Sequence, residues 1–326
     1  MKFNALSRLG IAVFAGAALL SSGSLLAGQW PEKPVRVIVP FAPGGGTDIQ
    51  ARLLTINFHD KTGQTFIVDN RAGAGGLIGG ELTAHADPDG YTLLFSTATL
   101  AVNTTLFGKS MRFSAVKDLA PVSWVSSAPL VLVTHPNVPA KTVPELIALA
   151  KKRPNFMNGA VNTPGSTSHL SGEMFKQLAH ISFVIVPFKG GGPAVGSVVA
   201  GETDFLFATA PSSAPFIHNH RLKALAVTTA KRASAFPDLP TMSEFIPGFV
   251  TDNWYAMYFP KGTPQDIVAK MNGLIKDALG SAKVKEFYAH EGLDPIGSTP
   301  EALTKLLKSE IVKYAKVIKR GNIKVR

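Results

Sequence analysis

The chain of 326 residues contains no cysteine. This absence excludes disulfide bridges, thiolate metal sites and cysteine nucleophiles, and also a lipid anchor on a cysteine at the signal cleavage site. Since no covalent cross-link can hold the fold together, the chain must be stabilised by its own apolar core. Its length is sufficient for two α/β domains of ordinary size.

Acidic residues are also scarce: 22 Asp and Glu stand against 33 Lys and Arg, which gives a formal net charge of +11. A basic surface can attract nucleic acid, anionic lipid or small anionic ligands, or it can serve solubility alone. No run of Lys and Arg is interleaved with aromatic residues, so we expect no nucleic-acid partner. The 8 histidines show no H-x-x-x-H or H-E-x-x-H spacing, so we expect no metal and no cofactor.

Only one long apolar run is present, and it lies at the N-terminus. Lys2 and Arg8 precede the apolar stretch 9–20, which is too short to span a bilayer comfortably, and small residues follow it up to Ala27. This pattern predicts a signal peptide over residues 1–27. Because no second run has spanning length, we expect an exported protein that is located in the periplasm.

The most informative stretch is 35–49, which reads V-R-V-I-V-P-F-A-P-G-G-G-T-D-I. Its first seven residues predict a buried strand, and Thr47 and Asp48 are good N-cap residues for a following helix. The three glycines between them let a ligand approach the backbone closely, and a helix N-terminus favours a carboxylate or phosphate. The stretch therefore predicts an anion-binding loop; the alternative is a tight turn with no ligand. No Lys-Ser or Lys-Thr follows the glycines, which argues against a phosphate P-loop.

The rest of the chain alternates strands and helices. Apolar runs predict strands at 66–69, 91–95, 130–133, 156–161, 183–188, 203–208, 222–228 and 254–259. Helical patterns cover 47–61, 76–85, 141–153 and 165–180 and begin again at 189, 263 and 299. Thr142, Thr263 and Thr299 are the expected N-caps of three of these helices, and Gly321 is the expected end of the last one. This alternation predicts an α/β fold of two doubly wound domains. We assign residues 28–128 and 250–326 to the first domain and residues 129–249 to the second, joined by a two-strand hinge with the ligand in the cleft between them.

Small polar residues and glycines are expected to line this cleft from both domains. Ser96 and Thr97 end a predicted strand, at the edge where open α/β sheets bind ligands; an ordinary loop is the alternative. In the second domain, Gly165-Ser166-Thr167-Ser168-His169 and Lys189-Gly190-Gly191-Gly192-Pro193 each open a helix. The middle of the chain thus repeats the design of its start: strand, glycine- or hydroxyl-rich loop, helix N-terminus.

Three of these motifs together resemble those of a known family. Pro40–Asp48, Gly165–His169 and Val186–Ala194 are similar to segments of the Bug family, the extracytoplasmic solute receptors of tripartite tricarboxylate transporters. The resemblance runs from about Trp30 to the C-terminus. It implies a periplasmic binding protein of type II-like, two-strand-hinge architecture that closes on its ligand like a flytrap. It also implies a small organic carboxylate or related amide as ligand, and a membrane partner with a large and a small integral subunit.

In the family, backbone groups of the first glycine loop and of the second domain's loops hold the ligand carboxylate. By resemblance, ligand contacts are expected at Phe41, Ala42, Gly45, Gly46, Thr47, Asp48, Ser96, Thr97, Asn103, Ser166, Thr167, His169, Gly190 and Gly191. Asp204 opens a predicted strand toward the presumed cleft and is added as a partner for an amine or hydroxyl group of the ligand.

Several of these residues have an ordinary structural interpretation as well. Asp48 can cap its own loop, Phe41 can be plain core, and His169 can serve capping or packing. Lys189, beside the second glycine loop, can pair with the ligand or simply point to solvent. Asp204 can be a structural turn acid.

The sequence therefore predicts a monomeric receptor, not an enzyme, that binds a small organic acid and delivers it to a membrane carrier. The alternative is a secreted α/β hydrolase that acts on small esters or amides through Ser166 and His169. No G-x-S-x-G elbow supports that alternative.

Overall fold

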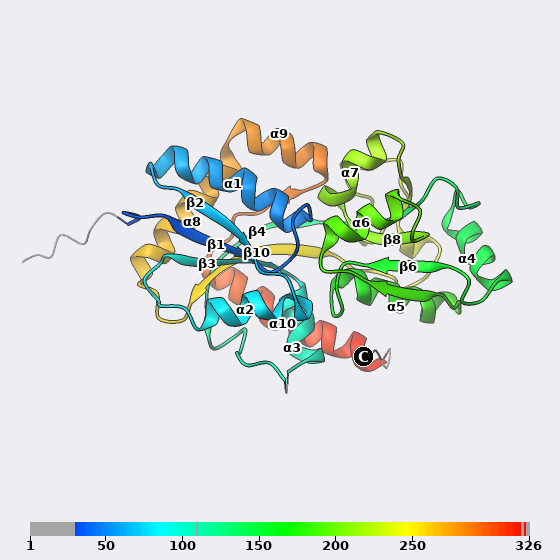
Figure 1. The fold of residues 1–326 in the computed structure, drawn as a ribbon, viewed down its shortest axis with the longest axis horizontal. Helices are drawn as coiled ribbons and strands as arrows, with labels where there is room; N and C mark the ends of the chain where they lie inside the picture. The colour runs from blue at the N-terminus through cyan, green and yellow to red at the C-terminus, as the bar shows by residue number, and fades with distance from the viewer. Residues whose placement is uncertain (1–29, 109, 321–322, 324–326) are drawn as a thin grey trace, which may run out of the picture.

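The computed structural model describes residues 30–108, 110–320 and 323. The predicted signal peptide lies outside these residues. Figure 1 shows an elongated molecule with a β-sheet in each half. None of the described helices is both long and apolar enough to cross a membrane.

The first sheet contains six strands in the order β11-β4-β10-β3-β1-β2. Its strands are β1 (Val35–Val39), β2 (Phe66–Asn70), β3 (Thr92–Thr97), β4 (Leu119–Ala128), β10 (Asn253–Pro260) and β11 (Asp294–Pro295). Strands β1, β2 and β3 are parallel, whereas β10 runs antiparallel to both of its neighbours, β3 and β4. All eight residues of β10 are buried, as expected of a central strand covered on both faces.

The second sheet contains five strands in the order β7-β6-β8-β5-β9. Its strands are β5 (Leu130–Thr134), β6 (Asn158–Val161), β7 (Val184–Pro187), β8 (Phe205–Thr209) and β9 (Lys223–Val227). Here β5 is the strand that runs antiparallel to both neighbours. Apart from β11, the two sheets therefore have the same order, with the antiparallel strand in the same place.

This shared order reflects two crossings of the chain between the halves. The chain leaves the first sheet after β4 and enters the second as β5; it leaves the second after β9 and returns to the first as β10. Each antiparallel strand is thus the one that has just arrived from the other half. The prediction of two α/β units with a double crossing is confirmed, and the fold is mixed α/β of the two-domain, type II-like class.

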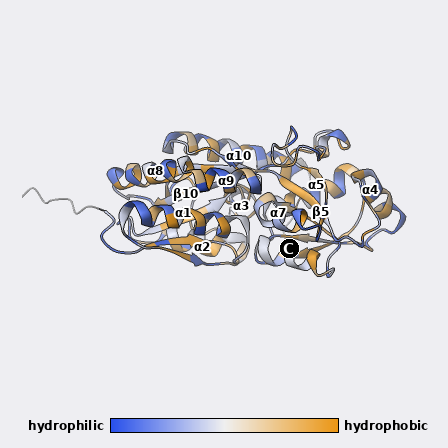
Figure 2. Cartoon of the chain, turned by 90° about the horizontal axis from the view of Figure 1, so that it is seen from above, coloured by the Kyte–Doolittle hydropathy of each residue, from blue (hydrophilic) through white to orange (hydrophobic). Residues whose placement is uncertain are grey.

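Helices cover both faces of each sheet. They are α1 (Gly46–Thr62), α2 (Leu77–Ala84), α3 (Thr99–Leu106), α4 (Val143–Lys152), α5 (Thr167–Ala179), α6 (Gly191–Val199), α7 (Ala210–His218), α8 (Gln265–Gly280), α9 (Ala282–Glu291) and α10 (Pro300–Arg320). On the first sheet, α1 and α9 lie on one side, and α2, α3 and α10 lie on the other (Figure 1). The alternation of side chains along a strand divides β1 accordingly: Val37 packs into the core under α1 and α8, and Ile38 packs into the core under α10. In Figure 2 these helices carry both hydrophilic and hydrophobic residues, because one side of each faces solvent.

The helix starts agree with the sequence at most positions and differ at one. Thr142 and Thr299 cap α4 and α10 as predicted, since their hydroxyls accept from the N–H groups of Glu145 (3.3 Å) and Ala302 (3.3 Å). Thr263, predicted to cap the next helix, does not: its hydroxyl donates to the Pro260 carbonyl at 2.9 Å and closes the turn after β10, and α8 begins two residues later. The predicted end of α10 at residue 321 lies outside the described residues.

Candidate functional site

A buried cavity of about 30 Å³ lies where the two halves of the molecule meet. Both sheets contribute the loops that follow their strands. The lining residues are Phe41, Gly45, Gly46, Thr47, Thr97, Thr99, Asn162, Thr163, Ser166, Thr167, Gly191, Thr209, Asn253 and Tyr255. The side chains of this lining are almost entirely removed from solvent; Thr167 is 2% exposed and Tyr255 0%.

Five of the described helices begin at this cavity. Its lining includes the first residues of α1 (Gly46), α3 (Thr99) and α6 (Gly191), and the N-cap residues of α5 (Ser166) and α7 (Thr209). The first turn of a helix presents unpaired N–H groups and the positive end of its dipole. The arrangement therefore concentrates positive potential and hydrogen-bond donors on one small volume.

Charged side chains are absent from the cavity lining within the described residues. Its side-chain groups are hydroxyls, two amides and aromatic rings. A site of this kind recognises an anion through neutral donors and helix ends, without a Lys or Arg partner.

The two glycine loops touch each other across the boundary between the halves. The Ala42 N–H donates to the Lys189 carbonyl at 3.0 Å, and a Cβ added to Gly45 would lie 3.3 Å from the Gly191 nitrogen. A methyl group on Gly192 would overlap the Pro43 carbonyl oxygen. Only glycine permits this approach, because any Cβ at that position would force the loops apart.

Asn253 and Tyr255 of β10 bring two further donors to the cavity. The Asn253 Oδ1 accepts from the Thr167 hydroxyl at 3.2 Å, which leaves the Nδ2 amide group without a partner among the described residues. The Tyr255 hydroxyl is buried and makes no hydrogen bond of good geometry among the described residues, although the Thr209 and Asn253 side chains lie near enough to influence its pKa. Burial raises the pKa of Tyr255 to about 12, so this hydroxyl is protonated and able to donate at neutral pH. Unmet buried donors are costly and call for an explanation.

Sequence reasoning missed these two residues, together with Thr99, Asn162, Thr163 and Thr209. Asn253 and Tyr255 lie on or beside an apolar run that predicts a buried strand and nothing more. The signal that could have found them is their spacing: residues two apart on a strand face the same side, so both point where the strand passes the cleft.

Asp48 lies beside the cavity but faces its own loop. Its carboxylate accepts from the Gly44 N–H at 3.0 Å, from the Asn70 amide at 3.0 Å and from Arg52 at 3.1 Å. Although partial burial opposes it, hydrogen bonds from Arg52, Gly44 and Asn70 hold the pKa of Asp48 below its usual value. With these bonds the Asp48 carboxylate stabilises the first glycine loop, which agrees with the capping interpretation.

Ser166 and His169 do not form a nucleophile–base pair. The Ser166 hydroxyl accepts from the backbone N–H of His169 at 3.1 Å and so caps α5. The His169 ring Nδ1 accepts from the Gly165 N–H at 3.2 Å, and its Nε2 lies 3.9 Å from a Glu173 oxygen. Burial lowers the pKa of His169, an effect that Glu173 partly offsets. The hydrolase alternative, which needs His169 to accept the Ser166 proton, is not supported.

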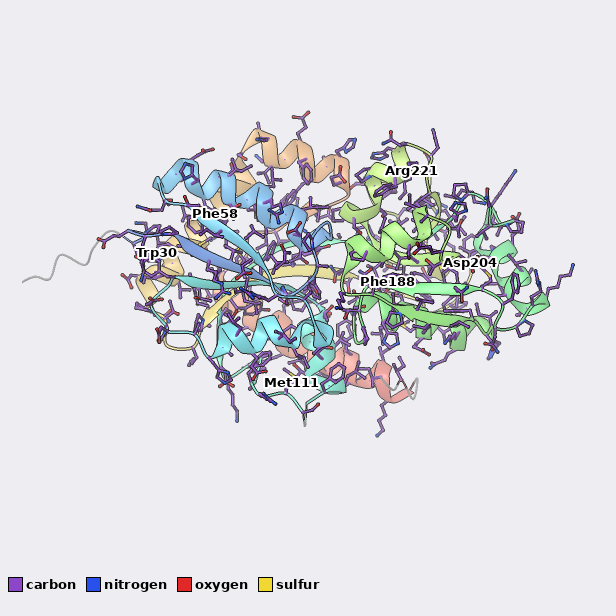
Figure 3. The ribbon with its side chains drawn as sticks, viewed as in Figure 1. Trp30, Phe58, Met111, Phe188, Asp204 and Arg221 are labelled. Carbon is purple, nitrogen blue, oxygen red and sulfur yellow. The ribbon has the colours of Figure 1, made fainter. Side chains whose placement is uncertain are left out.

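Five other predicted residues lie outside the cavity lining. Ala42 and Gly190 form the contact between the loops, and Ser96 is buried in β3 beside Ala256. The Asn103 amide donates to the Gly75 carbonyl at 2.7 Å and holds the loop before α2. Asp204 accepts from the Asn158 N–H at 2.6 Å and lines a separate space on the second half. Figure 3 shows Asp204 well inside that half, with Phe188 nearer to the junction.

The comparisons with known proteins agree with this geometry. Residues 50–323 match the Tripartite tricarboxylate transporter family receptor model. Protein BugT of Bordetella pertussis is 39% identical over 303 residues, which cover 92% of this chain and 93% of BugT. The structure of Rpa4515 from R. palustris with adipate superposes with a TM-score of 0.87 at 33% identity, covering 90% of this chain and 99% of that one. MatC from Rhodopseudomonas palustris with bound malate gives a TM-score of 0.84 at 31% identity, covering 88% and 99%.

Receptors of this family are periplasmic, bind small carboxylates and work with membrane transporter components; they are not enzymes. The matched region includes every residue of the cavity lining from Thr97 to Tyr255. The chain belongs to the tripartite tricarboxylate transporter receptor family and is a solute-binding receptor of the Bug type.

Proposed function

We propose that the buried cavity is the carboxylate-binding site of this receptor and that the two halves of the molecule close over the ligand. One observation carries the proposal. The N-termini of five helices meet at a cavity that has no charged side chain in its described lining. An anionic ligand would satisfy the donors there, whereas a cation would face the positive ends of all five dipoles.

The energetics favour a carboxylate over a neutral ligand. A favourable helix end contributes about 0.3–1 kcal/mol to an anion at the surface and up to about 2 kcal/mol when partly buried. Each hydrogen bond to a charged group adds roughly 1.5–3 kcal/mol. Two carboxylate oxygens can accept about four such bonds, and the loop N–H groups together with Tyr255 and Asn253 supply that number. The adipate and malate seen in the two relatives are anions of this kind.

Closure is part of the proposal because both halves line the cavity and neither encloses it alone. Its lining is nearly inaccessible to solvent, and a backbone hydrogen bond joins the loops at its edge. A ligand would enter when the halves move apart at the two crossing segments. We take residues 28–128 with 250–326 and residues 129–249 as the two lobes, and residues 1–27 as the signal that exports the chain to the periplasm. The loaded monomer would then deliver its ligand to a large and a small membrane subunit.

Tyr255 provides a sharp test of the site. Tyr255→Phe removes one donor from the cavity and should weaken carboxylate binding by about tenfold or more, since a hydrogen bond to a charged group is lost. Tyr258→Phe is the matched control: its hydroxyl is also buried on the same strand and has no hydrogen-bond partner among the described residues, but it does not line the cavity.

The measurement is isothermal calorimetry of the purified mature protein with a panel of mono-, di- and tricarboxylates and their amides. Binding of at least one acid, with a loss in Tyr255→Phe and none in Tyr258→Phe, is the expected result. If both variants bind the acid with the same affinity, the cavity is not the carboxylate-binding site. Failure of every acid and amide to bind or to raise the melting temperature would refute the carboxylate function itself.

A further inference from the structure

A second space, a groove of about 940 Å³, lies beside the buried cavity at the junction of the two halves. Both halves form its walls. Its side chains are mainly apolar: Ala42, Leu77 and Phe107 come from the first half, and Pro164, Phe188 and Pro193 from the second. We call this space the junction groove.

The junction groove adjoins the cavity along three segments of chain. Phe41 lines the cavity and Ala42 the groove; Gly191 lines the cavity and Lys189 the groove; Thr163 lines both. Consecutive Cα atoms are only about 3.8 Å apart. The two spaces are therefore only one or two residues apart along each of these segments, on either side of the hydrogen bond from the Ala42 N–H to the Lys189 carbonyl.

The cavity alone is too small for a whole organic acid. A space of this kind needs about 10–15 Å³ for one water molecule, so 30 Å³ accommodates roughly two atoms of water size. That is the size of a carboxylate head group. The remainder of any larger ligand must lie elsewhere, and the groove is the adjoining volume with room for it.

The walls of the groove determine what that remainder can be. Lys189 is the one charged residue among its described lining residues, and it is exposed. The other groups offer few hydrogen bonds, so hydroxyl or carboxylate groups placed against them would lose their hydration without compensation. Apolar groups would gain by burial there.

We infer that the ligand of this receptor is a carboxylate with an apolar body, an alkyl chain or aromatic ring, that extends from the cavity into the junction groove. This inference rests on the proposed function and narrows its ligand class. It favours acids such as hexanoate or phenylacetate over short acids rich in hydroxyl or carboxylate groups, such as malate and citrate.

The first experiment is calorimetry on the mature protein with propionate, butyrate, hexanoate, phenylacetate, malate and citrate. Burial of each methylene contributes about 0.8 kcal/mol, so affinity should rise up to about fourfold per added carbon. Hexanoate should therefore bind tens of times more tightly than propionate. Equal affinity along the series, or a preference for malate or citrate, would overturn the inference and leave the carboxylate site intact.

The second experiment separates the groove from the cavity by mutation. Phe188→Ala and Leu77→Ala should each weaken hexanoate binding by about tenfold and leave propionate binding unchanged. Phe156→Ala and Ile78→Ala are the matched controls, because these side chains are 55% and 48% exposed and lie outside the groove. The controls should bind both acids as the wild type does.

The remaining outcomes also decide the matter. If propionate and hexanoate lose affinity equally, the groove residues affect closure of the two halves and not contact with the ligand body, which contradicts the inference. Unchanged hexanoate affinity in both groove variants would also contradict the inference. The groove would then be open to another occupant, such as a segment of the membrane carrier. If no acid binds at all, the carboxylate function fails, and the inference fails with it.

Discussion

His169 illustrates how a single residue near the site is fixed by its surroundings. Its ring is 7% exposed, and Nδ1 is occupied as an acceptor for the Gly165 N–H. Protonation would place a second N–H against that donor, and burial already disfavours the charged ring. Both effects keep the pKa of His169 below its ordinary value of 6.5. His169 therefore braces the loop before α5 in its neutral form.

This pKa predicts a change of stability with pH. Below about pH 6.5 the unfolded chain binds a proton at His169 that the folded protein refuses, so the free energy of unfolding falls as the pH is lowered through this region. His169→Asn keeps an acceptor near the Nδ1 position and removes the titration. Its unfolding free energy should fall less between pH 7.5 and 5.5 than that of the wild type, in urea titrations.

The comparison isolates His169 because the variant and the wild type share every other titratable group. The pKa values of Asp48 and Asp69 are lowered from 3.8, so the stability they contribute is lost only in more acidic solution. His85→Asn, a substitution of an exposed histidine, controls for the loss of a histidine as such. A slope in His169→Asn as steep as the wild-type slope would show that His169 is not the group responsible.

At the level of elements, the start of α6 determines how closely the two halves approach. Gly192→Ala adds a methyl group that would overlap the Pro43 carbonyl oxygen of the other half. The helix itself tolerates alanine well, better than glycine by about 1 kcal/mol. We therefore expect a protein that folds normally but closes poorly, with carboxylate affinity reduced about tenfold or more.

Gly196→Ala is the matched control on the same helix, because nothing lies within 4 Å of a Cβ built there. Thermal unfolding without ligand and calorimetry with ligand distinguish the two variants. Neither variant should be less stable to unfolding than the wild type, and carboxylate affinity should fall only in Gly192→Ala. Wild-type affinity in Gly192→Ala would show that the loops need not meet in the bound state.

The strands show which elements can be predicted from sequence. Strands β1, β5, β8 and β9 are short apolar runs, and the prediction found all of them because burial on both faces leaves little room for polar residues. Strand β4 was missed, since it contains Pro121 and three serines among its apolar residues. Helix α7 was missed as well, because Pro211 and Pro215 argue against a helix, although Pro211 sits harmlessly in the first turn.

Site residues could be predicted where a local sequence pattern marks them. Glycine loops and N-cap hydroxyls have a recognisable local pattern, so Gly45, Gly46, Thr47, Ser166, Thr167 and Gly191 could be named, and all six line the cavity. Tyr255 could not be named, because its place depends on β10 inserting between β3 and β4 after a crossing of the whole chain. Asp204 was expected at the cleft, but it directly precedes the first residue of β8. The other end of that strand, at Thr209, is the end that reaches the cavity.

On the scale of the whole molecule, the two halves share the work of the site. Each contributes helix N-termini, and neither encloses the cavity without the other. The strands that arrive from the opposite half, β5 and β10, lie in the interior of their sheets. Neighbouring strands on both sides therefore hold the ends of the crossing segments in place. A rigid rotation about the two crossing segments would open the site without unpairing any strand of either sheet.

The net charge also acts on the scale of the whole molecule. The full sequence carries 11 excess positive charges, of which only Lys2 and Arg8 lie in the proposed signal. The remaining excess attracts anions over distances that salt screens, since the Debye length falls from about 30 Å at 0.01 M to about 3 Å at 1 M. Inside the cavity the donors are neutral, and screening by salt hardly reaches a buried site. The association rate constant of the acid should therefore fall several-fold between 0.02 and 0.5 M NaCl, while the dissociation rate constant stays nearly constant.

Stopped-flow fluorescence measures both constants, because Trp254 lies on β10 between the cavity residues Asn253 and Tyr255. The amide of the same acid is the control: it lacks the charge, so its association rate should not depend on salt. If the acid and its amide respond equally to salt, the positive charge does not steer the ligand. The surplus of Lys and Arg would then serve solubility alone, and the selectivity of the receptor would arise entirely from the neutral donors inside the closed cavity.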